Sequence, residues 1–245
     1  MGNVMFMRKG EVHTTPVGGL PLSSLAVGTI VKLNVNGTPK DFIIVNQGKP
    51  GNSTLYDDSC DGMWLMMKDL YEKRAWDSTN NDYANSDVHA YLNGTFLGLL
   101  DSDVQSIIKQ VKIPYIKGSQ SSSLASGSNG LSTKVFLLAA NETGATSSDF
   151  VALADEGAKL SYFESGTGDT ANSKRIAYYN GTATKWWFRT PYSATADNVN
   201  AVDTNGKPNG GSLCTYAEMG IRPALIIPSD LLTTVNNDGS VNLIL

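Results

Sequence analysis

The sequence is poor in the residues that most often carry catalysis. Its 245 residues include two histidines, His13 and His89, and two cysteines, Cys60 and Cys214. His-Glu-x-x-His, Cys-x-x-Cys and Gly-x-Ser-x-Gly are all absent, so the signatures of zinc proteases, thiol oxidoreductases and serine hydrolases are missing. A nucleophile–histidine site would depend on His89 alone, because His13 lies in a predicted arm. We therefore predict no catalytic residue, no metal and no cofactor.

Positive charge and long apolar runs are also scarce. The chain has 19 Lys and Arg against 23 Asp and Glu, a net charge of −4, so we expect no nucleic-acid partner. No window approaches the ~18 apolar residues of a membrane-spanning helix. The N-terminus lacks the apolar stretch and cleavage site of a signal peptide, and we expect no membrane insertion. Two distant cysteines predict two free thiols and synthesis in a reducing cytoplasm, with a single disulfide as the alternative.

The composition is that of a globular protein preceded by an arm. Apolar residues make up 41% and charged residues 17% of the chain, which is typical of a protein with a core. Residues 1–24 combine an apolar start with a stretch rich in Pro, Gly, Ser and Thr, which cannot build a core of its own. We interpret them as an assembly arm that docks onto a neighbouring subunit, with a disordered tail as the alternative. The predicted division is an arm of residues 1–26 and a domain of residues 27–245.

Short strands open and close this domain, with helices between them. Two runs, 29–35 and 41–46, flank Asn36-Gly37, a strong hairpin signal. Further strands are expected at 63–68, 111–116, 134–140, 186–191 and 220–227. Helices are expected after a Ser86 N-cap, over 103–110 and over 154–163, and loops at 119–130 and 165–175. The pattern predicts an α+β fold with a mostly antiparallel sheet and two or three helices.

Two apolar stretches, 185–193 and 220–227, each contain one arginine. In the first, strand alternation places Trp187 and Arg189 on one face and Trp186 on the other. An arginine in such a run is buried and must be paired. We expect Arg189 and Arg222 to bond backbone carbonyls or carboxylates and to fix the loop ends, with ligand anchoring as the alternative. The predicted structural frame is Trp186, Trp187, Arg189, Pro191, Gly220, Arg222 and Pro223.

The segment between these stretches, residues 194–219, is polar and is expected to be a loop. Loops beyond ~12–15 residues are usually functional or disordered. Its Tyr, Ser, Asn and Asp content gives the adaptable hydrogen bonding and aromatic contact of binding surfaces. An ordinary solvated loop is the alternative. Elsewhere, the acidic turn Asp57–Asp61 has Lys68 where a calcium loop needs a bidentate Glu, so calcium binding there is only a minor alternative.

The motifs WWFRTP (from Trp186) and GIRPAL (from Gly220) resemble the uncharacterised WWLRSP…GIRPAL domains common in gut Firmicutes, their phages and prophages. The resemblance extends upstream of these motifs, where segments that begin at Trp76, Tyr91, Lys134 and Arg175 occur in the expected order, and it covers residues 28–229. Such domains resemble the C-type-lectin-like fold in its formylglycine-generating-enzyme-like branch. Some are variable proteins of diversity-generating retroelements. The copper-site cysteine pair of the formylglycine enzyme and the calcium motifs of sugar-binding C-type lectins are absent here.

The resemblance places the diversified, ligand-facing positions within residues 192–218. The predicted ligand-binding residues are Tyr192, Ser193, Thr195, Asp197, Asn198, Asn200, Asp203, Asn205, Lys207, Asn209, Ser212, Cys214, Tyr216 and Glu218.

This resemblance implies a phage virion-associated adhesin or receptor-binding protein that is not an enzyme. Its partners would be a bacterial cell-surface protein or glycan, and other virion subunits through residues 1–24. We expect a homo-oligomer, with a trimer favoured, made in the bacterial cytoplasm and carried on the virion; the cell surface is the alternative location. The alternative functions are a structural virion or cell-surface domain without a ligand, and a carbohydrate-active hydrolase.

Overall fold

A computed structural model describes residues 19–51, 54–146 and 156–245. Its largest element is an eight-stranded sheet with the order β1-β16-β17-β2-β3-β4-β15-β9. Its pairs are antiparallel except for β17 with β2. The strands are β1 (Leu20–Pro21), β16 (Leu232–Val235), β17 (Val241–Leu243), β2 (Ile30–Val35), β3 (Thr38–Gln47), β4 (Met63–Met67), β15 (Ala224–Ile227) and β9 (Val135–Phe136).

The hairpin between β2 and β3 confirms the strongest turn signal of the sequence. Asn36 and Gly37 both have positive φ, 51° and 68°, as a two-residue turn matched to the strand twist requires. The expected strand at 63–68 is β4, and all five of its residues are buried. The second arginine stretch supplies β15, which is also buried throughout. β4 and β15 pair antiparallel near the centre of the sheet.

Four smaller sheets complete the strand content, and part of it corrects the sequence prediction. They pair β5 (Val111–Ile113) with β8 (Leu131–Thr133), β6 (Tyr115–Gly118) with β7 (Ser121–Ala125), β10 (Tyr178–Tyr179) with β11 (Thr182–Ala183), and β12 (Trp186–Pro191) with β13 (Asn198–Val202) and β14 (Pro208–Leu213). The expected loop 119–130 is wrong in part because β7 lies in it. The expected loop 194–219 is wrong in part because β13 and β14 form a hairpin there.

Helices are few in the described residues. Ser86 accepts a hydrogen bond from the His89 amide and caps α1 (Asp87–Tyr91), as predicted. A π-helical turn (Leu92–Phe96) and α2 (Leu97–Leu99) continue α1, and α3 (Ser102–Ile107) follows. The expected helix at 154–163 is wrong over 156–163, which are not helical, while α4 (Asp169–Ser173) falls in the expected loop at 165–175. Short 3₁₀ turns lie at Leu22–Ser24, Asp58–Cys60, Tyr83–Asn85 and Asn141–Thr143.

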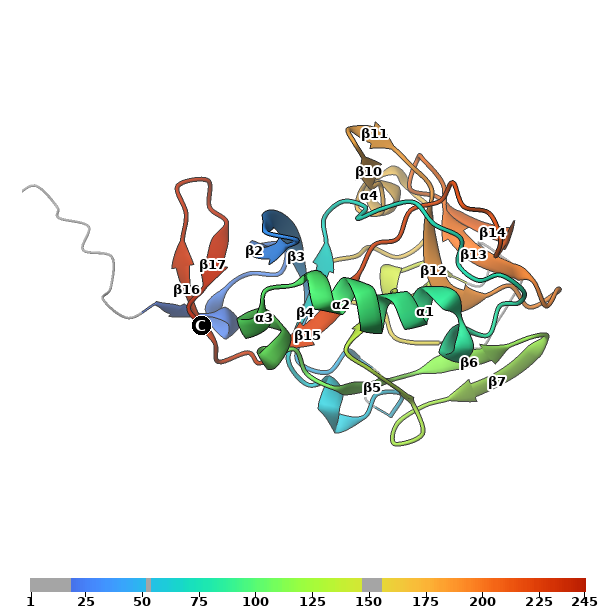
Figure 1. Cartoon of the computed structure of the whole chain (residues 1–245), viewed down its shortest axis with the longest axis horizontal. Coiled ribbons are helices and arrows are strands. Elements are labelled where there is room, and N and C mark those ends of the chain that lie inside the picture. Colours follow the sequence, from blue (N-terminus) through green and yellow to red (C-terminus); the bar gives the residue numbers. More distant parts are fainter. Residues whose placement is uncertain (1–18, 52–53, 147–155) are drawn as a thin grey trace, which may run out of the picture.

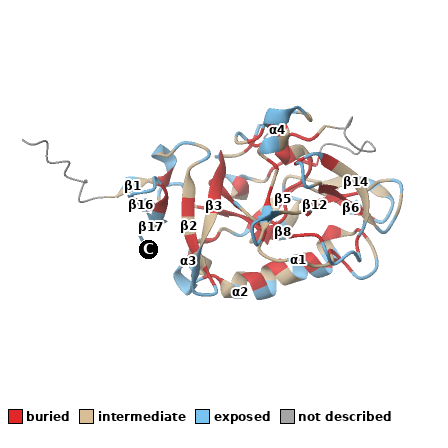
Figure 2. Ribbon diagram, turned by 90° about the horizontal axis from the view of Figure 1, so that it is seen from above, coloured by how far each residue is buried: buried red, intermediate tan, exposed pale blue. Residues whose placement is uncertain are grey.

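The molecule is elongated, and its two ends carry different parts of the chain (Figure 1). β1, β16, β17 and the C-terminus lie at one end, and β6, β7, β13 and β14 lie at the other. Burial concentrates on the strands between them (Figure 2). Of the predicted arm, residues 1–18 lie outside the described residues; Leu20–Pro21 pairs with β16, and Leu22 is buried. Cys60 and Cys214 are free and buried, as predicted.

Candidate ligand-binding surface

Strand β12 is fully buried and divides its side chains between two packed clusters. Trp187 belongs to the main core, whereas Trp186 and Phe188 pack in a smaller cluster with Val202. The Trp186 and Phe188 rings meet edge to face, with centroids 5.1 Å apart. The alternation predicted for this stretch is therefore confirmed. It makes the strand a fixed base for the hairpin that follows.

Arg189 is buried in an ion-pair network, as predicted. Its guanidinium forms two hydrogen bonds with the Glu142 carboxylate, of 2.7 and 2.8 Å, and lies 3.6 Å from Glu156. It also donates to the carbonyls of Pro114, Leu137 and Glu156. All three charged side chains are fully buried. The network joins β12 to the segments that precede it in the chain.

The second frame arginine, Arg222, is buried by a different arrangement. Its Nε donates to the Met67 carbonyl at 2.9 Å and its Nη2 to the Lys68 carbonyl at 2.7 Å. The guanidinium carbon lies 5.2 Å from the centre of the Trp186 ring. Backbone carbonyls thus accept the hydrogen bonds of Arg222. This confirms the prediction that the arginine would bond backbone carbonyls or carboxylates.

The remaining frame residues join β12 to β15. Gly220 accepts a hydrogen bond from Trp187 and donates one to Lys185. A Cβ at Gly220 would clash with the Leu70 side chain, so a larger residue would require Leu70 to move. Pro191 ends β12, and Pro223 directly precedes β15. The frame therefore surrounds the base of the segment 192–218.

Asn81 organises the backbone of the predicted ligand-binding segment. Its buried side-chain amide donates to the carbonyls of Tyr192, Thr195 and Asn198 at 2.6–3.1 Å. Its side-chain oxygen accepts a hydrogen bond from the Ser119 amide. One side chain from outside the segment therefore fixes the turn between β12 and β13.

A second attachment holds the chain beyond β14. The Cys214 carbonyl accepts hydrogen bonds from the amides of Trp76 and Asp77, and the Cys214 amide donates to Asp197. The Asp77 carboxylate in turn accepts from the amides of Thr79, Asn80 and Asp87. These hydrogen bonds lower the Asp77 pKa against the opposing effect of burial. The segment 76–87 is thus a clamp for both ends of the hairpin.

The structure separates the predicted ligand-binding residues by exposure. Asn200 and Cys214 are buried. Asp203 is half-buried, and its side chain accepts hydrogen bonds from the amides of Asn205 and Lys207 within its own turn. Tyr216 is exposed, at 51%. Asp197, Asn205, Lys207 and Glu218 are also exposed, and Tyr192, Ser193, Thr195, Asn198, Asn209 and Ser212 are half-buried.

Sequence reasoning missed two contributors to this surface. Leu213, at the end of β14, is 54% exposed, and an exposed leucine beside Tyr216 offers apolar contact to a partner. The second contributor, Asn81, lies in the segment that begins at Trp76. Its position among polar residues gave no signal that its side chain would be buried, because its three acceptors lie more than 110 residues further along.

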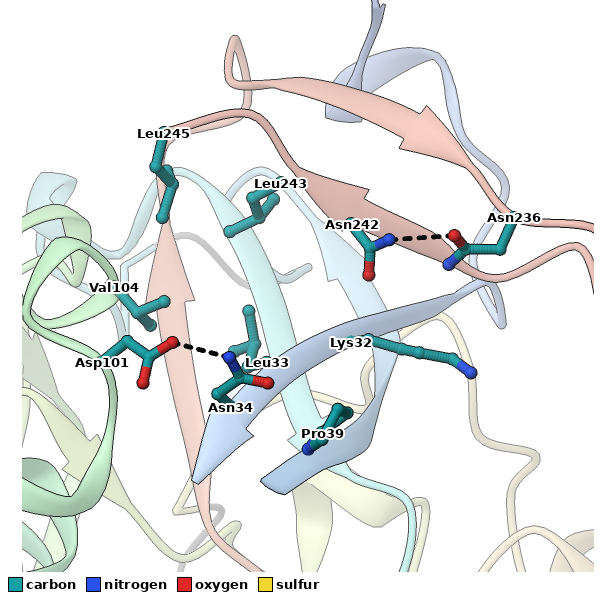
Figure 3. A pocket seen from close by; sticks show the side chains of 10 residues that line it. All are labelled: Lys32, Leu33, Asn34, Pro39, Asp101, Val104, Asn236, Asn242, Leu243 and Leu245. Atoms are coloured by element: carbon teal, nitrogen blue, oxygen red, sulfur yellow. Dashed lines mark hydrogen bonds between the residues drawn. The ribbon is translucent and has the colours of Figure 1, made fainter. Parts of the chain in front are cut away.

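Hollows elsewhere on the molecule are lined by other residues. The pocket in Figure 3 has a volume of about 350 Å³ and lies between β2, β17 and the residues around α3. Its polar groups are partly satisfied by one another, because Asn34 donates to Asp101 and Asn242 to Asn236. No residue of 192–218 lines this pocket. The predicted ligand-binding surface therefore consists of side chains on a hairpin and does not include this pocket.

Two further features are absent from the described residues. None of their helices is both long and apolar enough to span a membrane. Nor do the described parts of the chain bring together three or more His, Cys, Asp or Glu side chains in a way that could hold a metal ion. The predicted acidic turn instead uses Asp57 to accept a hydrogen bond from the Ser59 amide, which caps a 3₁₀ turn.

Replacing Asn81 with alanine should loosen the hairpin. The change removes one buried NH2 group, whose two hydrogens serve three carbonyls, and one acceptor, and an unsatisfied buried group costs ~1–3 kcal/mol. We expect the free energy of unfolding to fall by ~2 kcal/mol and amide exchange to quicken at residues 192–198. Asn85→Ala is the matched control, since Asn85 is exposed and its side chain bonds Asp82 at the surface. Equal exchange rates in the two variants would contradict the assigned role of Asn81.

Together these features describe a sheet-rich α+β domain that carries a clamped, solvent-facing hairpin. The chain belongs to the DUF6273 family, described as a domain of unknown function, whose model matches residues 61–229. The match includes β12, β13, β14 and the clamp at 76–87, but not β1, β2 or β3. No curated protein and no solved structure matches the chain.

Proposed function

We propose that this protein is a phage virion-associated adhesin that binds bacterial surface ligands through residues 192–218. The observation that carries the proposal is the way in which this segment is held. Its backbone is fixed by the Asn81 side chain and by the amides of Trp76 and Asp77, all outside the segment. The exposed side chains of the segment are not needed for those bonds. They are free to change without loss of the fold, as diversification by a retroelement would require.

The shape of the molecule supports the same proposal. The predicted binding residues on β13 and β14 lie at the end opposite β1 and the C-terminus (Figure 1). An arm that leaves from the β1 end could join other virion subunits without covering the hairpin. Repeated copies would raise the avidity of a weak site. For this reason we favour a homo-oligomer, with a trimer as the preferred form.

We further propose the C-type-lectin-like fold, in its formylglycine-generating-enzyme-like branch, as the class of this domain. The observations that support it are the mixed α+β content, the largely antiparallel sheet and the order of the motifs from Trp76 to the GIRPAL motif. In that class, ligand binding on an irregular hairpin above a fixed core is the expected mode. Contact by Tyr192, Tyr216 and Leu213, with hydrogen bonds from the Asn and Ser residues, would provide it.

The test is binding of the fluorescently labelled full chain to a panel of gut Firmicutes cells. A Tyr192→Ala/Tyr216→Ala double variant is expected to lose at least ~10-fold in binding while its melting temperature stays unchanged, since lost aromatic hot spots cost ~2 kcal/mol or more. Lys117→Ala, an exposed change on β6 outside the segment, is the control. Retained binding by the double variant would refute the site. Release of soluble sugar from purified cell walls would instead support the hydrolase.

A further inference from the structure

A second hollow lies against the main sheet beside Arg222. It has a volume of about 430 Å³, within the range of small-molecule sites. Its lining combines three basic residues, three hydroxyl-bearing residues, one acid and several small or apolar residues. The lining is Gly28, Ile30, Ile43, Lys68, Asp69, Tyr162, Ser173, Lys174, Ile176, Tyr178 and Arg222. None of the residues 192–218 contributes to it.

Arg222 differs from Arg189 in how its charge is balanced. Arg189 has the carboxylates of Glu142 and Glu156 beside it. Arg222 is 2% exposed, and within the described parts of the chain only carbonyl oxygens and the Trp186 ring contact its guanidinium. Burial lowers the pKa of Arg222 to about 10, which still leaves it charged at neutral pH. Asp69 in the lining acts on the Arg222 charge electrostatically, but no carboxylate among the described residues is hydrogen-bonded to it.

Two lysines add positive charge at the same hollow. The Lys68 side chain is half exposed, and its Nζ lies 3.6 Å from Asp41. The Lys174 Nζ lies 3.1 Å from Glu164 and 5.2 Å from the centre of the Tyr162 ring. Asp69 is the acid in the lining, and it accepts a hydrogen bond from the Tyr178 amide. Asp41 and Glu164 pair with these two lysines, so Arg222 is the cation of this lining that has no carboxylate ion pair among the described residues.

The walls favour a sugar as the carrier of the anionic group. Tyr178 is 45% exposed, so its ring is available to stack on the apolar face of a pyranose. Tyr162, Tyr178 and Ser173 bring hydroxyl groups to the lining, and these can exchange hydrogen bonds with sugar hydroxyls. Ile30, Ile43 and Ile176 supply an apolar floor. Charge, hydroxyls and one exposed aromatic ring are the combination that an acidic sugar would use.

We infer that this hollow binds an acidic sugar, with its carboxylate or phosphate against Arg222 and Lys174 and its ring against Tyr178. The site is separate from the adhesin surface proposed above and does not depend on it. Carboxylate and phosphate share the recognition chemistry, so the experiment distinguishes them.

The experiment titrates the full chain with glucuronic acid, glucose 6-phosphate, glucose and inorganic phosphate, followed by NMR chemical shifts. We expect at least one of the two acidic sugars to bind ~10-fold or more tightly than both glucose and inorganic phosphate. A response to glucuronic acid alone would assign a carboxylate ligand, and a response to glucose 6-phosphate alone a phosphate ligand. Equal binding of glucose would overturn the role of charge, and equal binding of inorganic phosphate would overturn the role of the sugar.

Variants place the ligand in the hollow. Arg222 is buried, so the test uses Lys174, which is half-buried, and Tyr178, which is exposed. Lys174→Gln and Tyr178→Ala should each weaken acidic-sugar binding by ~5-fold or more, with an unchanged melting temperature. Lys117→Gln, on β6, should leave binding unchanged. Full binding by both hollow variants would overturn the site. Cell binding by Lys174→Gln measures the hairpin surface separately. Loss of acidic-sugar binding and loss of cell binding can therefore be told apart.

Discussion

An Arg189→Met variant is expected to be the most damaging single change in this domain, lowering the free energy of unfolding by ~3–5 kcal/mol. Arg189 bonds both oxygens of Glu142, and both residues are fully buried. Without the guanidinium, the Glu142 carboxylate keeps hydrogen bonds from Tyr56 and Ala139 but has lost its counter-charge. Three backbone carbonyls also lose a donor.

Urea denaturation followed by circular dichroism measures this effect. Lys73→Met is the matched control, because the ion pair of Lys73 with Glu218 is largely exposed, and such pairs contribute ~0–1 kcal/mol. Combining Arg189→Met with Glu142→Gln should recover part of the loss, since the orphaned charge is then removed. If Arg189→Met is as stable as Lys73→Met, the network is not a main support of the fold.

Glu156 should make the stability of the domain depend on pH. One guanidinium balances one carboxylate, yet two carboxyl groups are buried beside Arg189. Burial raises the pKa of Glu156 from its ordinary value of 4.5 to about 7, against the opposing attraction of Arg189. In the folded protein Glu156 therefore keeps its proton to a higher pH than in the unfolded chain.

The sign of the effect follows from this difference. Below pH 4.5 the proton is bound in both states. Between pH 4.5 and about 7 the unfolded chain loses it first, so rising pH favours unfolding, by ~3 kcal/mol in all. Glu156→Gln has no proton to lose. Relative to the natural chain, its free energy of unfolding should therefore rise by ~3 kcal/mol between pH 4 and pH 8.

Denaturation at pH 4 and pH 8 gives the free energy of unfolding of Glu156→Gln relative to the natural chain at each pH. Comparing the two relative values removes any effect of the amide that does not depend on pH. Glu164→Gln is the control, since the Glu164 carboxylate is half exposed and paired with Lys174 at the surface. Its stability relative to the natural chain should change by less than ~1 kcal/mol over the same range. A parallel pH dependence of the natural chain and Glu156→Gln would contradict the assignment.

Features encoded by neighbouring residues were predictable from the sequence. Asn36 and Gly37 form the β2–β3 turn because both residues readily adopt a positive φ. Ser86 caps α1 by accepting a hydrogen bond from the nearby His89 amide. The buried strand β12 follows from its run of apolar residues. Arg189 was expected to be paired, but its partners Glu142 and Glu156 are two of 23 acids, and nothing local marks them.

Features that depend on distant pairing were not predictable in this way. β7 is rich in serine and β14 in glycine, so both have weak strand propensity and exist because β6 and β13 pair with them. The expected helix at 154–163 had a suitable composition, but Leu160 and Phe163 are buried in a non-helical segment. In the candidate surface, Asn200 is buried because β13 is a strand between two others, which a loop prediction could not anticipate.

The parallel pair β17–β2 has a consequence for synthesis of the chain on the ribosome. Val31 pairs with Val241, so the two partners are 210 residues apart. The β2–β3 hairpin can form early, but the other edge of β2 stays unpaired until the chain has been extended past residue 241. An open strand edge invites pairing with other nascent chains. The yield of folded protein should therefore depend on how long this edge stays open during synthesis.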